Sequence, residues 1–239
     1  MNKDELVQFA KLKLTELYKQ HKSSGIEAIY IWGSVTRSDF DTQTSDIDVV
    51  CIVSDDFPLE MNEKLRDELT KAAPEREWGF QILYLSELNG GLLRSRLANA
   101  MSPQSILPSF NTWVFVCGKQ STRSDFSVHN ATISERMKLN IEEIRRRLAN
   151  IPTDDDYKKA RDRKGVVKAA LLLTYNRQLK RGEEFELDYN ELQNHSDKLE
   201  QPILKILLQI KRKSLYDDNF SAYISAIENF ASAVEQELS

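Results

Sequence analysis

The run Ile29-Tyr30-Ile31-Trp32-Gly33-Ser34, followed after the eleven residues 35–45 by Asp46-Ile47-Asp48-Val49-Val50, decides the fold of the first part of the chain. Both runs are rich in β-branched and apolar residues, which is typical of buried strands. Because side chains alternate along a strand, Asp46 and Asp48 are predicted to project from one face while the residues between and after them enter the core.

Two neighbouring carboxylates repel each other unless a cation neutralises them. Their oxygens suit a hard cation such as Mg²⁺, which normally also takes phosphate oxygens. Gly33 allows a phosphate to approach the backbone closely, Ser34 offers a hydroxyl and an amide donor, and Arg37 adds positive charge. The pattern predicts Asp46 and Asp48 as metal ligands and catalytic carboxylates beside a phosphate-binding turn. The alternative is two exposed aspartates on an edge strand, with Gly-Ser as an ordinary turn.

A family resemblance rests on Trp32-Gly33-Ser34 and Ser45-Asp46-Ile47-Asp48-Val49. These residues resemble the signature of the DNA polymerase beta-like nucleotidyltransferases, and most of all the bacterial group with aminoglycoside adenylyltransferases and the minimal nucleotidyltransferases of toxin–antitoxin pairs. The resemblance implies Mg²⁺ held by Asp46 and Asp48, and ATP or another nucleoside triphosphate as co-substrate. The residues expected to bind the nucleotide are Gly33, Ser34, Arg37, Ser45 and, from the C-terminal part, Lys168.

The family usually carries a third carboxylate one strand further on, where this chain reads Trp78-Gly79-Phe80-Gln81-Ile82-Leu83. Gln81 is interpreted as occupying that position, and a neutral amide cannot accept a proton. Three alternatives stay open. Glu77 or Glu87 serves instead, a carboxylate of the C-terminal part acts as base, or the site binds nucleotide without fast turnover.

The fold class predicted from periodicity is an α/β (α+β) domain with a mixed sheet over residues 1–130, followed by an all-α helical bundle over residues 131–239. The strands are expected at 26–32, 47–53, 80–85 and 112–117, and the helices of the first part at 3–22, 60–72 and 92–100. The later helices are expected at 134–149, 154–181 with a break at Gly165, 187–199, 203–215 and 220–238. The site is expected between the two domains, where pockets often form.

Composition limits the partners. The net charge of −4 argues against strong binding to duplex nucleic acid, and no apolar run reaches the ~20 residues that span a bilayer. The charged start Met1–Glu5 has no signal-peptide pattern, so a cytoplasmic protein is expected. Cys51 and Cys117 are interpreted as reduced core residues. The oligomeric state is not indicated.

The expected reaction is Mg²⁺-dependent transfer of a nucleoside monophosphate, with AMP from ATP as first choice, to a hydroxyl of a small molecule such as an aminoglycoside. One alternative is transfer to a protein or a tRNA. Another is a degenerate nucleotide-binding regulatory module. Lys164 and Lys168 are candidate triphosphate contacts, whereas Asp154–Asp156 is interpreted as a helix start. For Arg145–Arg147, a contact to phosphates or RNA and a solvated helix face both stay open.

Overall fold

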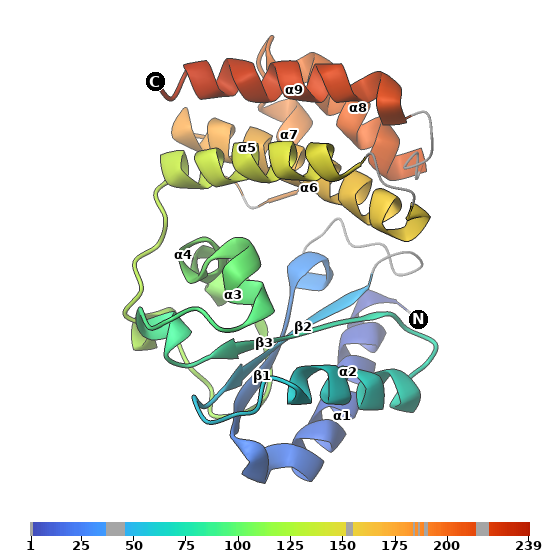
Figure 1. The fold of residues 1–239 in the computed structure, drawn as a ribbon, viewed down its shortest axis with the longest axis vertical. Coiled ribbons are helices and arrows are strands. Elements are labelled where there is room, and N and C mark those ends of the chain that lie inside the picture. Colours follow the sequence, from blue (N-terminus) through green and yellow to red (C-terminus); the bar gives the residue numbers. More distant parts are fainter. Residues whose placement is uncertain are drawn as a thin grey trace. The chain divides into compact units, whose positions relative to one another are not determined.

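The computed structural model describes residues 2–36, 46–151, 155–183, 185, 187, 188, 191–213 and 220–239. It divides into two compact units, Met1–Asn130 and Ala131–Ser239. The first unit combines a sheet with helices and the second is helical, so the predicted fold class is confirmed (Figure 1). None of the helices in the described ranges is long and apolar enough to cross a membrane.

Four strands form one mixed sheet in the order β3-β2-β1-β4. Strand β1 (Ile26–Trp32) pairs antiparallel with β2 (Ile47–Val53) and with β4 (Val114–Gly118). Strand β3 (Trp78–Tyr84) runs parallel to β2, and helix α2 (Met61–Ala72) lies in the crossover that parallel neighbours require. The predicted bounds of β1 and β2 are confirmed, whereas β3 begins two residues earlier than expected.

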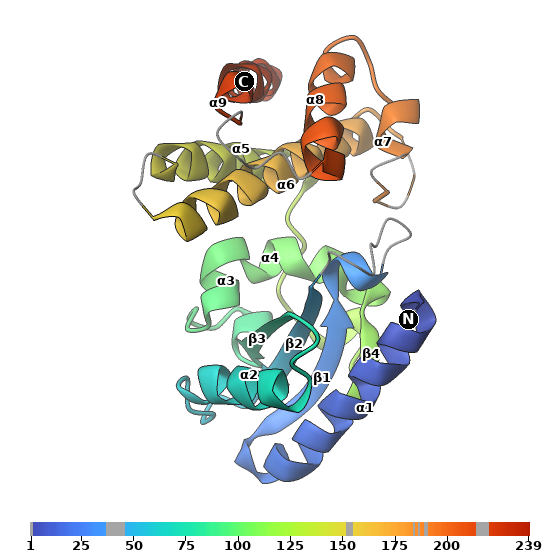
Figure 2. The ribbon, with the colours of Figure 1, turned by 90° about the vertical axis from the view of Figure 1, so that its right-hand side faces the viewer.

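Both faces of the sheet are covered, which explains why its central strands are almost continuously apolar. Helix α1 (Lys3–His21) and α2 pack on one face, and Figure 2 shows α1 lying along the sheet. Helix α3 (Arg96–Met101), helix α4 (Pro103–Ile106) and the short turn η4 (Leu107–Thr112) contribute to the core on the other face. That second face carries the alternate strand residues, among them the aspartate discussed below.

The predicted helix over residues 92–100 is wrong at its start. Helix α3 begins at Arg96, because the hydroxyl of Ser95 caps it by accepting the amide of Ala98 at 3.1 Å. The amides of Arg94 and Ser95 are bonded instead to the buried carboxylate of Glu87. The chain before α3 is therefore held by a side chain, which a periodicity pattern does not reveal.

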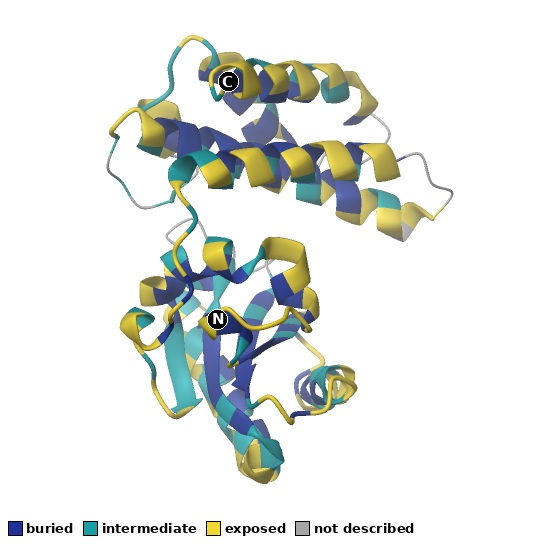
Figure 3. Ribbon diagram, turned by 60° about the vertical axis from the view of Figure 1, so that its left-hand side comes forward, coloured by how far each residue is buried: buried dark blue, intermediate teal, exposed yellow. Residues whose placement is uncertain are grey.

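The second unit is built from five helices in the part that the structure describes: α5 (Ile133–Asn150), α6 (Asp156–Lys180), α7 (Glu191–Asn194), α8 (Glu200–Lys213) and α9 (Ser221–Gln236). Their facing sides share one apolar core, and Figure 3 shows the buried residues on these inner sides. The predicted helix over 187–199 is wrong in extent. Asp197 accepts the amides of Leu199 and Glu200, both at 3.0 Å, and so caps the start of α8.

The predicted break at Gly165 is also wrong, because α6 runs unbroken from Asp156 to Lys180. Gly165 instead gives room to the Arg147 side chain of α5, since a Cβ atom there would lie about 2.2 Å from Nη1 of that guanidinium. Arg147 in turn pairs with the buried carboxylate of Asp162 at 3.1 Å. Gly165 of α6 therefore provides the space in which the Arg147 side chain of α5 packs.

A buried charge network ties three helices of the second unit together. Arg177 of α6, only 7% exposed, donates to Glu237 after α9, to Asp197 before α8 and to the fully buried Glu200 of α8. The pKa of Arg177 is raised, chiefly by the hydrogen bonds to Glu237, against the opposing effect of burial. Gln178 satisfies the second oxygen of Glu200 at 2.9 Å. Such a network is costly to break, because removing one member leaves a buried charge without its partner.

The two cysteines are free and are separated by a strand. Cys51 on β2 and Cys117 on β4 are both paired with Ile29 of β1, one on each side. Two strand spacings amount to about 10 Å, beyond the reach of a disulfide. Burial raises the pKa of both thiols, that of Cys117 to about 11. Cys51 therefore lies in the core, as the sequence predicts, whereas Cys117 is half-buried and packs against that core.

Candidate active site

Asp48 is the second residue of β2 and stands in the middle of a row across the sheet. In the pairing register it is level with Trp32 of β1 on one side and with Gly79 of β3 on the other. Asp46 directly precedes β2. Ile47, between the two aspartates, is fully buried, whereas both aspartates are half-buried. The alternation predicted from the sequence is therefore present, with the carboxylates reachable and the isoleucine in the core.

The Gly-Ser turn packs directly on the Asp48 carboxylate. Gly33 has a positive φ of 75°, a conformation that favours glycine, and a Cβ atom there would lie 2.4 Å from Oδ2 of Asp48. The short turn Gly33–Thr36 is closed by Thr36, whose hydroxyl donates to the Gly33 carbonyl at 2.9 Å, and is anchored by buried Val35. Ser34 lies half-buried in the same turn. The structure thus brings Gly33, Ser34 and Asp48 together.

On the other side of Asp48 stands Gly79, a residue that the sequence reasoning missed. A Cβ atom at this position would lie 2.4 Å from Oδ1 of Asp48. Gln81 lies on the same face of β3 as Gly79, but it pairs with Val50, two residues further along the strands than Asp48. The interpretation of Gln81 as the residue beside the carboxylates is therefore wrong in register. Gly79 could have been predicted as a site residue because a glycine inside a strand often marks the close approach of another group.

Of the two alternative carboxylates, Glu87 is excluded by its surroundings. It is fully buried beyond the far end of β3 and accepts the amides of Tyr84, Arg94 and Ser95 at 2.5–2.8 Å. It therefore fixes the loop before α3. Glu77 is exposed and lies at the Asp46 end, since its carbonyl accepts the amide of Ile47 at 3.0 Å. Glu77 stays a candidate.

Three further predicted nucleotide-binding residues are not tested by the described structure. Arg37 and Ser45 lie outside the described residues. Lys168, like Lys164 one turn before it, is exposed on α6 in the second unit. A triphosphate contact by Lys168 therefore stays a prediction, as does a site between the two units.

The charged runs of the second unit have structural partners. Asp155 caps α6 by accepting the amide of Lys158 at 3.0 Å, while Asp154 lies outside the described residues. Arg145 forms a bidentate pair with Glu235 on α9. Arg146 and Arg147 both pair with Glu143. Asp155 and Asp156 thus lie at a helix start, as expected, and the three arginines pair with carboxylates of the same unit.

The donor set beside Gly33 and Gly79 fits a hard divalent cation. Mg²⁺ is commonly bound by one or two protein carboxylates, with water and substrate phosphates completing its six ligands. Asp46 and Asp48 provide two such carboxylates, and neither glycine has a side chain to cover the oxygens of Asp48. Within the described ranges, no group of three or more His, Cys, Asp or Glu residues forms a protein-only metal site. A site that relies on phosphate oxygens is consistent with that donor set.

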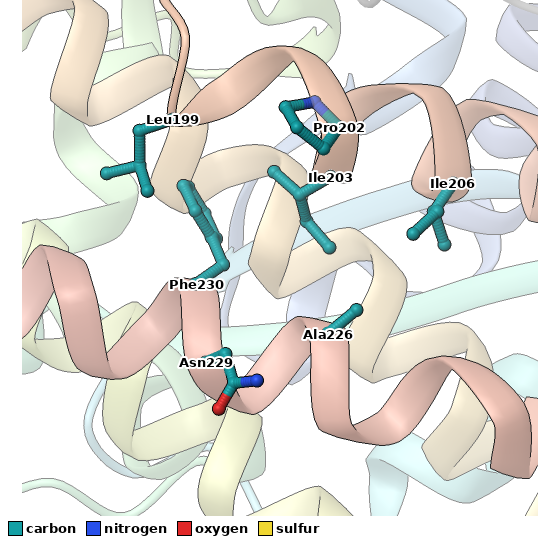
Figure 4. A pocket seen from close by; sticks show the side chains of 7 residues that line it. All are labelled: Leu199, Pro202, Ile203, Ile206, Ala226, Asn229 and Phe230. Carbon is teal, nitrogen blue, oxygen red and sulfur yellow. The ribbon is translucent and has the colours of Figure 1, made fainter.

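The second unit holds an apolar hollow of about 200 Å³ between α8 and α9 (Figure 4). The described residues that line it are Leu199, Pro202, Ile203, Ile206, Ala226, Asn229 and Phe230. None of them is charged, so this hollow lacks groups that would bind a triphosphate. The lining of this hollow therefore differs in chemistry from the Asp46–Asp48 site.

Comparison with known proteins agrees with this geometry. Residues 13–86 match the family model of the nucleotidyltransferase domain, a range that includes Gly33, both aspartates and Gly79. No curated protein sequence matches the chain. Among solved structures, the fold is similar to a spectinomycin adenyltransferase, AAD(9) from Enterococcus faecialis, crystallised with ATP and spectinomycin. The TM-score is 0.60 at 11% identity, over 94% of this chain and 99% of the other.

Proposed function

We propose that this chain, whose residues 13–86 match the nucleotidyltransferase domain, transfers AMP from ATP to a hydroxyl group of a small molecule of the aminoglycoside type. The observation that carries the proposal is the Asp48 carboxylate packed beside Gly33 at the start of the Gly33–Thr36 turn, with Asp46 two residues before Asp48. The likeness to a structure that holds ATP and spectinomycin supports ATP as the donor and an aminoglycoside as the first acceptor to test.

Each residue of the site has a role in such a transfer. Asp46 and Asp48 would hold Mg²⁺, which neutralises the triphosphate and polarises the phosphorus that is attacked. Gly33 leaves space for a phosphate, and the Ser34 amide and hydroxyl are donors to its oxygens. The acceptor oxygen forms a bond to the α-phosphorus, the bond from that phosphorus to the bridging oxygen breaks, and pyrophosphate leaves with the electron pair. Glu77 is the candidate to take the hydroxyl proton.

The decisive test is the release of pyrophosphate by Asp46→Asn and Asp48→Asn. Each change keeps the size of the side chain and removes its charge, so we expect transfer to fall below about 1% of the unmodified rate. Asp67→Asn, at an exposed position on α2, is the matched control and should leave the rate unchanged. Acceptors to screen with MgATP include spectinomycin and streptomycin. Wild-type turnover by Asp48→Asn on an established acceptor would disprove the site.

A second candidate is a nucleotide-binding regulatory module without fast turnover. It is favoured by one observation, the lack of any side chain on β3 level with Asp48. An equilibrium titration with MgATP, run beside the pyrophosphate assay over the acceptor panel, separates the two functions. Binding without release across the panel supports the module, and release with any acceptor supports the transferase.

A further inference from the structure

We infer that Gly79 is a positioning residue for Asp48, and that a side chain at this point of β3 displaces the carboxylate from the geometry in which it binds metal and nucleotide. The inference rests on the proposed function, because it concerns the same carboxylate. Gly79 lies on a third strand, β3, and contributes to the site through the absence of a side chain beside Asp48.

The Asp48 carboxylate leaves no space for a side chain at Gly79. Gly79 and Asp48 are directly paired on parallel strands, so their side-chain directions point to the same face. A Cβ atom at Gly79 would lie 2.4 Å from Oδ1 and 3.4 Å from both Cα and Cγ of Asp48. The 2.4 Å contact is about 1 Å shorter than ordinary van der Waals distance. Any residue other than glycine therefore requires the carboxylate to rotate away.

The opposite oxygen of Asp48 is confined in the same way. A Cβ atom at Gly33 would lie 2.4 Å from Oδ2. The carboxylate thus occupies a slot between two positions without side chains, one on each neighbouring segment. It cannot escape from an alanine at Gly79 by moving towards Gly33 without closing on the backbone of the Gly33-Ser34 turn.

Backbone conformation does not account for the glycine at position 79. The glycines with positive φ are Gly25, Gly33, Gly90, Gly118 and Gly182, and Gly79 is not among them. It lies in a regular strand, where alanine is accepted by the backbone and glycine weakens the structure. Space for the Asp48 carboxylate is the remaining reason in the described surroundings of this residue.

A displaced carboxylate has a measurable effect on metal binding. Changing a residue that orients a metal ligand typically lowers metal affinity by about 10- to 100-fold. Gly79→Ala is expected to weaken Mn²⁺ binding to the protein with a non-hydrolysable ATP analogue by this factor. The control is Gln81→Ala on the same strand and face, level with Val50, where affinity should stay within about twofold.

The experiment is a Mn²⁺ titration followed by electron paramagnetic resonance, which reads binding without turnover. It is combined with thermal unfolding of Gly79→Ala, Asp48→Ala and the double variant. If Gly79 acts through Asp48, Gly79→Ala destabilises the unmodified protein and has little effect once the carboxylate is gone. Mn²⁺ affinity of Gly79→Ala within twofold of the unmodified protein would overturn the inference. A folded Gly79→Ala whose instability persists without the carboxylate would overturn it as well.

Failure of the proposed function gives a different result. If the unmodified protein binds no Mn²⁺ with nucleotide, the metal role of Asp46 and Asp48 is refuted, and so is the metal-binding part of this inference. The thermal cycle then still decides whether Gly79 positions the carboxylate. If binding is normal but no acceptor releases pyrophosphate, transfer is refuted while the Mn²⁺ comparison between Gly79→Ala and Gln81→Ala decides the inference.

Discussion

Replacing Gly33 by alanine is expected to lower the free energy of unfolding for two reasons. The first is backbone strain, because a residue with a Cβ at φ 75° loses about 1–2 kcal/mol. The second is the collision with Oδ2 of Asp48, at 2.4 Å from the added Cβ. Moving that carboxylate off its rotamer costs a further ~0.5–1.5 kcal/mol. Gly33→Ala should therefore lower the free energy of unfolding by roughly 1.5–3.5 kcal/mol.

Gly90→Ala is the matched control for the strain. Gly90 has a similar φ of 83°, but nothing lies within 4 Å of an added Cβ. Its cost should be the strain alone, about 1–2 kcal/mol. The excess cost of Gly33→Ala over Gly90→Ala, ~0.5–1.5 kcal/mol, then measures the contact with Asp48. Urea unfolding of the three proteins gives these differences.

The same pair of variants tests the phosphate role of the turn. Gly33→Ala should raise the ATP dissociation constant at least about tenfold, which is roughly 1.4 kcal/mol, whereas Gly90→Ala should leave it unchanged. The sequence alone suggested a clash with the triphosphate, and the structure adds one with Asp48. Equal unfolding costs for the two variants, together with unchanged ATP affinity in folded Gly33→Ala, would show that Gly33 makes room neither for Asp48 nor for a phosphate.

Two further predictions concern the base and the helical unit. If Glu77 accepts the proton, Glu77→Gln should lower the rate of pyrophosphate release about 10²–10⁴-fold. The control is Glu75→Gln at a nearby exposed position, which should leave the rate unchanged, and equal rates for the two variants would exclude Glu77 as the base. Gly165→Ala should destabilise the unmodified protein by about 1–3 kcal/mol, because the added methyl group displaces Arg147 from buried Asp162. In a protein that already carries Arg147→Ala, Gly165→Ala should instead stabilise the fold by ~0.5–1 kcal/mol, because alanine has a higher helix propensity than glycine. Thermal unfolding in which Gly165→Ala destabilises both backgrounds would contradict this explanation.

The elements that the sequence predicts best are those specified by local signals. The strand bounds of β1 and β2 follow from two β-branched runs with polar ends, and these runs also place Asp46 and Asp48. The mixed sheet and the helical second unit follow from the same periodicity. The position of the candidate site could thus be predicted from two short segments.

What the sequence could not give depends on partners far away along the chain. The role of Gly79 depends on its register with Asp48, 31 residues earlier, which only the parallel pairing of β2 and β3 fixes. Gly165 looks like a helix breaker until the Arg147 side chain of another helix is placed beside it. Helix α8 starts at Glu200, three residues before the expected 203, because the carboxylate of Asp197 caps the helix and is itself paired with Arg177. Each miss is a tertiary contact that overrides a local propensity.

The raised pKa values of the two cysteines make this protein well suited to selective labelling. Burial raises the pKa of the Cys117 thiol to about 11 and shifts that of Cys51 in the same direction, so both thiols react slowly at pH 7. A cysteine introduced at an exposed position of α5, such as Glu142, would react far faster than either native thiol. A fluorophore or spin label attached there would report on how the helical unit responds to nucleotide, with the native cysteines left in place.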